Sequence, residues 1–110
     1  MDINIKKFKD DALTDVIVLL GEIMSIFISE KDEQKENVHS FLFYNILRKK
    51  INDSKNVFDV KFIEESNTVL VIVKSIDIHY IVEIKPFSNT YDIVNQFIVD
   101  SKSGEIIDCE

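Results

Sequence analysis

The sequence predicts an α+β fold: two N-terminal helices packed on one face of a mostly antiparallel sheet of about five strands. Before residue 52, apolar residues recur every three or four positions, which is the helical period. After residue 56, apolar and polar residues alternate, which is the period of a half-buried strand. The chain has 110 residues, of which 45% are hydrophobic. This is enough for one core, so we expect a single domain over residues 1–110.

The first helix is predicted over residues 11–30. Leu13, Val16, Leu20 and Phe27 follow the helical period, and further apolar residues widen their stripe. A helix that is apolar on most sides normally lies within a core. We expect Asp10 or Asp11 to cap its N-terminus by accepting hydrogen bonds from backbone N–H groups.

The second helix is predicted from about residue 33 to residue 51. Its basic end, formed by Arg48, Lys49 and Lys50, suits the negative end of the helix dipole. Its apolar residues are spread broadly around the helix, so it should contact two neighbours, one of which could be a second chain. The polar segment 52–56 then ends the helical part.

Five strands are expected after residue 56, at about 58–62, 68–74, 76–84, 93–99 and 106–109. Residues 69–73 are continuously apolar, which predicts a strand covered on both faces. A short helix at the start of the fourth strand is the alternative for that segment. Residues 100–104 should form a hairpin turn with Gly104 at a positive φ.

Composition excludes several classes of site. A single Cys excludes an internal disulfide framework and a thiolate zinc cage, and two Gly leave no room for a Gly-rich phosphate loop. We therefore expect no metal and no cofactor. The net charge of −7 argues against sequence-independent binding to nucleic acid or to an anionic membrane.

The N-terminal residues do not have the order of a signal peptide. Asp10 and Asp11 separate the basic residues Lys6, Lys7 and Lys9 from the apolar stretch that follows. A signal peptide places its basic residues directly before an apolar core and a small-residue cleavage site. We therefore expect a cytoplasmic protein, in which Cys109 is reduced.

The third expected strand contains the unit Glu83-Ile84-Lys85, in which Glu83 and Lys85 share one face of the strand. This Glu-x-Lys unit resembles the core of the nucleases named for their PD-(D/E)xK motif. The resemblance implies that Glu83 holds Mg²⁺, that Lys85 steadies the attacking water and that Asp59 supplies the upstream acid. The chain departs from the family pattern because it has no Pro-Asp pair.

Acidic residues are concentrated in the second half of the chain. Residues 1–55 contain ten acidic and nine basic side chains, whereas residues 56–110 contain ten and four. Such charges can simply keep sheet edges soluble and unpaired. Alternatively, they form a surface that attracts a basic partner. The residues expected to contact this partner are Asp100, Glu105, Asp108, Glu110, Glu64, Glu65 and Asp92.

We therefore expect a small acidic protein, not an enzyme, that neutralises another protein by covering a basic surface. In size, charge and layout the chain resembles immunity proteins of bacterial toxin systems and phage-encoded inhibitors such as anti-CRISPR proteins. The alternative is a dimeric chaperone or adaptor similar to those of bacterial secretion systems. Its subunit interface or client groove would contain Phe41, Phe43, Tyr44 and Leu47. A Mg²⁺-dependent nuclease that uses Glu83 and Lys85 is the third hypothesis. We expect a monomer or a homodimer.

Overall fold

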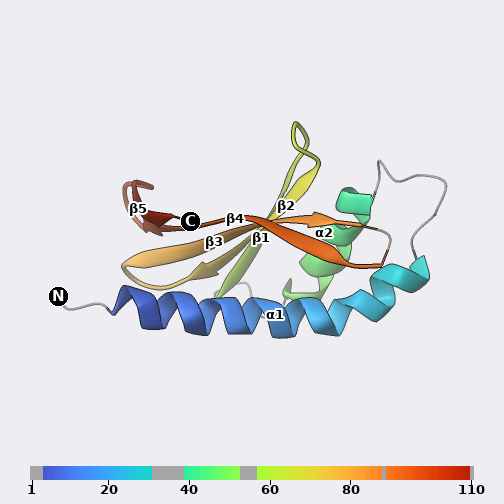
Figure 1. Ribbon diagram of the computed structural model, residues 1–110, viewed down its shortest axis with the longest axis horizontal. Helices are drawn as coiled ribbons and strands as arrows, with labels where there is room; N and C mark the ends of the chain where they lie inside the picture. The colour runs from blue at the N-terminus through green and yellow to red at the C-terminus, as the bar shows by residue number, and fades with distance from the viewer. Residues whose placement is uncertain (1–3, 31–38, 53–56, 88, 110) are drawn as a thin grey trace.

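The computed structural model describes residues 4–30, 39–52, 57–87 and 89–109. These residues form α1 (Ile5–Glu30), α2 (His39–Lys50), β1 (Phe58–Ile63), β2 (Thr68–Lys74), β3 (Ile78–Pro86), β4 (Tyr91–Asp100) and β5 (Ile106–Cys109). The strands form one antiparallel sheet in the order β1-β2-β3-β4-β5. Both helices pack against it, and α1 runs along one side of the sheet (Figure 1). The predicted α+β architecture is confirmed.

α1 begins at Ile5, before the predicted residue 11, and its N-terminus is capped by Asn4. The Asn4 side-chain oxygen accepts a hydrogen bond from the backbone N–H of Lys7 at 3.0 Å. This is the usual contact of an N-cap side chain with the first turn of a helix. The prediction that Asp10 or Asp11 is the cap is therefore wrong, because both lie inside α1.

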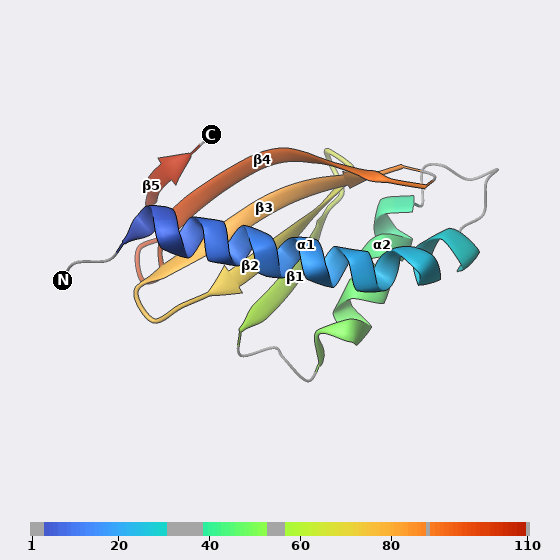
Figure 2. The same ribbon diagram turned by 60° about the horizontal axis from the view of Figure 1, so that its bottom comes forward.

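The inner side of α1 provides part of the core. Val16, Leu20, Ile23 and Phe27 are fully buried and repeat every three or four residues. Figure 2 shows α1 crossing the strands of the sheet. By length and composition alone, residues 5–29 would also suit a membrane span, a property that buried core helices share.

α2 adds Phe43 and Leu47 to the same core, both fully buried. The rings of Phe27 on α1 and Phe43 on α2 meet edge to face, with centroids 5.1 Å apart. Such aromatic pairs contribute about 0.5–1.5 kcal/mol beyond the area that they bury. The predicted start of the second helix near residue 33 lies outside the described residues.

The sheet presents matched rows of apolar side chains to the helices. The row formed by Val60, Val71 and Val82 is in register across β1, β2 and β3, and all three side chains are buried. Alternation places Leu70 and Ile72 of β2 on the other face. No helix of the described residues covers that face, so the prediction of a strand covered on both faces is wrong. Ile72 is still buried, because Ile81 lies beside it in register.

The strand ends and the last turn are close to those predicted. β3 begins at Ile78, after the predicted residue 76, and β4 is strand throughout from Tyr91. The turn between β4 and β5 has Gly104 at a φ of 75°, which confirms the predicted left-handed position. Because that conformation crowds a Cβ atom, glycine is the least strained residue there.

The cap of α1 is testable by a matched pair of variants. Asn4→Ala should lower the free energy of unfolding by about 0.5–1 kcal/mol, because it removes an N-cap acceptor. Asp11→Ala, which changes an exposed residue inside the helix, should change it by less than about 0.5 kcal/mol. Urea unfolding followed by circular dichroism measures both. An equal or larger loss for Asp11→Ala would contradict the assignment.

Candidate interaction surface

The structure distributes the predicted partner-binding acids over both ends of the sheet. Glu64 and Glu65 lie in the turn that joins β1 to β2. Asp100 and Glu105 flank the turn that joins β4 to β5. In an antiparallel sheet whose strands follow chain order, these two turns project from opposite ends. The seven residues therefore do not form one continuous acidic edge.

The carboxylate of Asp100 makes hydrogen bonds within its own turn. Its Oδ1 accepts hydrogen bonds from the backbone N–H groups of Lys102 and Ser103, each at 2.9 Å. These bonds, the one from Ser103 first, lower the pKa of Asp100 because they favour the ionised carboxylate. This side chain shapes the turn between β4 and β5.

Two further acids of the set lie opposite basic side chains. Oδ2 of Asp108 lies 3.4 Å from Nζ of Lys9, which joins β5 to the first turns of α1. Asp92 of β4 is exposed and lies in register with Lys85 of β3. Glu110 lies outside the described residues.

Glu64 and Glu65, like Asp92 and Glu105, are acids of the set that the fold leaves exposed. Neither Glu64 nor Glu65 has a side-chain hydrogen bond or ion pair with the residues that the structure describes. The turn that carries them includes Asn67 at a φ of 56°, a left-handed conformation that asparagine tolerates better than most residues. The hydroxyl of Ser40 donates a hydrogen bond to the carbonyl of Asn67, which ties this turn to the start of α2.

An aromatic cluster lies on the same side of the molecule. The rings of Phe41 and Tyr44 of α2 stack with their centroids 6.2 Å apart. Both rings contact Phe62, which lies near the end of β1, two residues before the acidic turn. Phe41 is 49% exposed, although its ring is large and apolar. Arg48 lies over the ring of Tyr44, 5.5 Å from its centre, as a cation–π pair. We call Phe41, Tyr44, Phe62, Glu64 and Glu65 the aromatic–acidic patch.

The structure separates the four residues of α2 that were expected to form one interface or groove, namely Phe41, Phe43, Tyr44 and Leu47. Phe43 and Leu47 belong to the core, so they are not free to form a subunit interface. Phe41 points away from the core, Tyr44 packs at the edge of the core, and both join Phe62. The sequence pattern marked Phe62 only as part of a half-buried strand. Its position two residues before a pair of exposed acids was the signal that could have linked it to them.

Glu83 of the nuclease-like unit makes structural hydrogen bonds. The carboxylate of Glu83 accepts bonds from Thr68 at 2.6 Å, from Asn95 at 2.7 Å and from Ser66 at 3.2 Å. The bond from Thr68, followed by that from Asn95, lowers the pKa of Glu83. Together these bonds link β2, β3 and β4 on the face of the sheet away from the helices.

Asp59 does not join Glu83 and Lys85 in a metal-binding arrangement. Asp59 lies on β1 opposite Ile72, whereas Glu83 lies on β3 opposite Leu70. A carboxylate oxygen of Asp59 accepts a hydrogen bond from the N–H of Val60. Across the described residues, no group of three His, Cys, Asp or Glu side chains is placed to hold a metal ion.

No protein-family model, curated protein or solved structure matches the chain.

The Glu83 network predicts a pH-dependent stability. Because folding lowers the pKa of Glu83, the stabilisation is complete above the ordinary glutamate pKa. It is lost as the pH falls through the lowered value. The Glu83→Gln variant should lose about 0.5–1 kcal/mol at neutral pH. Below the lowered pKa of Glu83, the variant and the wild-type protein should have nearly equal free energies of unfolding.

Urea unfolding of both proteins from pH ~7 to pH ~3 measures this difference. The Asp92→Asn variant removes an exposed carboxylate near the same end of β3 and serves as the control. A constant difference between wild type and Glu83→Gln over the whole range would show that the ionised carboxylate contributes no stability.

Proposed function

We propose that this protein is a small non-enzymatic inhibitor that binds another protein through the aromatic–acidic patch and covers a basic surface on it. One observation carries the proposal. The aromatic cluster of Phe41, Tyr44 and Phe62 is partly exposed, and the turn that follows Phe62 and Ile63 carries two exposed carboxylates that have no partner among the described residues. Aromatic residues with partly exposed rings are enriched at the centres of protein interfaces.

The exposure of Phe41 is better explained by binding to a partner than by a contribution to the stability of the fold. Burial of a phenylalanine side chain lowers the free energy of the folded state, whereas Phe41 leaves about half of its surface in water. Its neighbours Tyr44 and Phe62 are only partly buried, so the three rings form a partly exposed apolar surface beside the core. A partner that covers these rings would complete their burial.

The charge distribution supports a basic partner. Glu64 and Glu65 add two negative charges at the rim of the rings, and the second half of the chain has a net charge of −6. Opposite charges on two surfaces speed association and disfavour acidic competitors. The more distant acids, Asp92, Asp100 and Glu105, would contribute to this long-range attraction without contact.

The proposed mechanism is occlusion. The inhibitor needs no chemistry of its own, because the rings and the carboxylates exclude the normal ligand of the partner's basic surface. Lysine and arginine side chains on that surface would lie over the aromatic faces and beside the carboxylates. Immunity proteins of bacterial toxin systems and phage-encoded inhibitors are the classes of protein that this mechanism fits.

Affinity capture with paired variants tests the proposal. The wild-type chain is immobilised in a lysate of its native host, and bound proteins are identified by mass spectrometry. The Glu64→Lys/Glu65→Lys variant should retain at least about tenfold less of the captured protein, because two attractive charges become repulsive. Capture by the wild type should also weaken as NaCl is raised from ~0.05 M to ~0.5 M.

The matched control is Asp92→Lys/Glu105→Lys, which makes the same change of charge away from the aromatic rings. Because these acids contribute only long-range attraction, this variant should lose much less of the captured protein than Glu64→Lys/Glu65→Lys does. Circular dichroism first confirms that both variants are folded. Undiminished capture by Glu64→Lys/Glu65→Lys, or an equal loss in the control, would overturn the role of the patch.

A dimeric adaptor is the second candidate, and the outer side of α1 favours it. Ile17, Val18, Ile26 and Ile28 are each between 44% and 56% exposed. Analytical ultracentrifugation separates the two functions. A stable dimer that Ile17→Glu/Ile28→Glu dissociates would favour the adaptor, because both residues lie on one side of α1. A monomer of 12.8 kDa would exclude a dimeric adaptor.

A further inference from the structure

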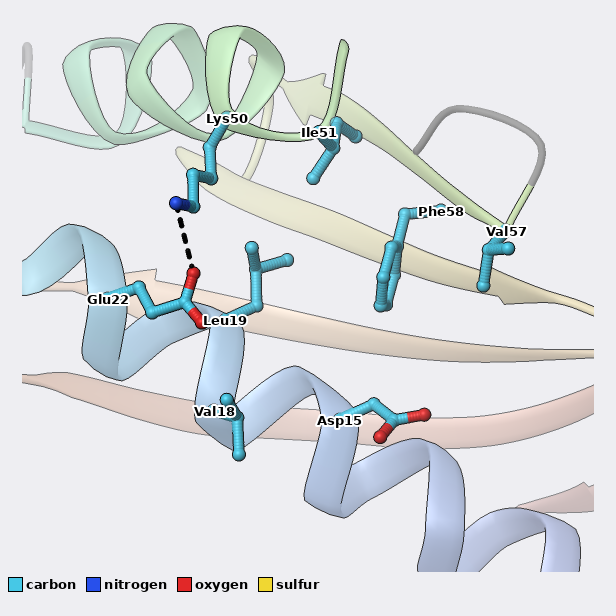
Figure 3. A pocket seen from close by; sticks show the side chains of 8 residues that line it. All are labelled: Asp15, Val18, Leu19, Glu22, Lys50, Ile51, Val57 and Phe58. Atoms are coloured by element: carbon cyan, nitrogen blue, oxygen red, sulfur yellow. Dashed lines mark ion pairs between the residues drawn. The ribbon is translucent and has the colours of Figure 1, made fainter. Parts of the chain in front are cut away.

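A pocket of about 420 Å³ lies between α1, the end of α2 and the start of β1. Figure 3 shows its lining side chains, with Val57 and Phe58 pointing from the start of β1 toward α1. The remaining lining residues are Asp15, Val18, Leu19 and Glu22 of α1, with Lys50 and Ile51 at the end of α2. The pocket is separate from the aromatic–acidic patch and shares no residue with it.

The walls of the pocket are largely apolar. Leu19 and Ile51 are buried and form its floor, and Phe58 is partly buried beside them. Val18 and Val57 are 56% and 47% exposed and stand at the rim. A ligand with an aliphatic or flat apolar portion would therefore remove exposed apolar surface from water.

The charged side chains of the pocket leave one carboxylate unpaired. Nζ of Lys50 lies 3.1 Å from a carboxylate oxygen of Glu22, so these two charges are paired across the opening (Figure 3). Asp15 lines the same space, and its side chain has neither a hydrogen bond nor an ion pair with any of the described residues. The three charges sum to −1, which complements a single positive charge on a ligand.

We propose that this pocket binds an arginine side chain of the partner protein. The guanidinium group pairs with the carboxylate of Asp15, and the three methylene groups lie against Val18 and Phe58. This inference rests on the proposed function, because it names one side chain of the basic surface that the protein covers.

Arginine fits this combination better than other side chains do. Its planar guanidinium donates two parallel hydrogen bonds to one carboxylate and stacks on an aromatic face. A lysine ammonium is a more strongly hydrated point charge, which loses more hydration on entering an apolar pocket. An acidic ligand would meet the unpaired charge of Asp15, and a neutral apolar ligand would leave that charge unused.

The pocket and the aromatic–acidic patch lie at opposite ends of the same helix. The pocket touches Lys50 at the end of α2 and Phe58 at the start of β1. The patch contains Phe41 near the start of α2 and Phe62 near the end of β1. At 1.5 Å per residue, the two ends of α2 are separated by about 15 Å. A partner that contacts both sites must therefore span about this distance.

The test uses the whole chain and a small probe, Nα-acetyl-arginine amide, in a titration followed by ¹H–¹⁵N NMR. Backbone amide signals of Asp15, Leu19, Ile51 and Phe58 should shift, with a dissociation constant of about 1–10 mM. Nα-acetyl-citrulline amide, which has nearly the same shape but no charge, should bind at least about tenfold more weakly.

Two variants then test whether the carboxylate of Asp15 binds the guanidinium group of the probe. Asp15→Asn should weaken binding of the arginine probe by roughly fivefold, because it removes the unpaired carboxylate from a partly exposed site. Asp10→Asn removes the same charge from α1 at a different pocket, and it should leave binding unchanged. Both replaced side chains are exposed, so the variants should fold as the wild type does.

Three results would overturn the inference. Equal binding of the arginine and citrulline probes would exclude recognition of the charge. Equal binding of Nα-acetyl-lysine amide would exclude arginine as the specific occupant. Shifts confined to residues outside the pocket would exclude the site. The capture experiment with Glu64→Lys/Glu65→Lys changes the aromatic–acidic patch and no residue of the pocket, so each of these results leaves it to decide the proposed function separately.

Discussion

The packing of both helices against a single face of the sheet is the constraint on which the rest of the structure depends. It requires α2 to direct Phe43 and Leu47 toward α1 and the inner strands, where both are fully buried. Successive residues of a helix are 100° apart, so Phe41 is turned about 160° from Phe43. Phe41 must therefore face outward over β1, where it contacts Phe62. The exposed rings are a direct consequence of how the core is built.

The same constraint positions the pocket and the charges. α2 packs beside β1, an edge strand, so its two ends lie over the two ends of that strand. One end places aromatic rings beside Glu64 and Glu65, and the other places apolar walls beside Asp15. Each site combines exposed apolar surface with a carboxylate that has no partner among the described residues. That combination suits lysine and arginine side chains, which have apolar stems and charged ends. A single basic partner is therefore a consistent explanation for both sites.

The sequence predicted most of the fold because its two apolar periods are clear. β2 has the predicted bounds, and Gly104 has the predicted conformation. The start of α1 was missed because Lys6, Lys7 and Lys9 hide the helical spacing of Ile5 and Phe8. The candidate site was only partly predictable. The concentration of acids in the second half of the chain predicts one shared surface, but successive turns of an antiparallel sheet project from alternate ends. Periodicity also cannot decide which side of a broadly apolar helix is buried.

The central claim is that Phe41 belongs to a binding surface and Phe43 to the core. The most direct test is the free energy of unfolding of Phe41→Ala and Phe43→Ala, measured side by side by urea denaturation. We expect Phe43→Ala to cost about 3–5 kcal/mol, because it leaves a cavity between the helices. We expect Phe41→Ala to cost about 1–2 kcal/mol, since its ring is half exposed and keeps only its contacts with Tyr44 and Phe62. Similar losses for the two variants would mean that Phe41 stabilises the fold as a core residue, which would contradict the account.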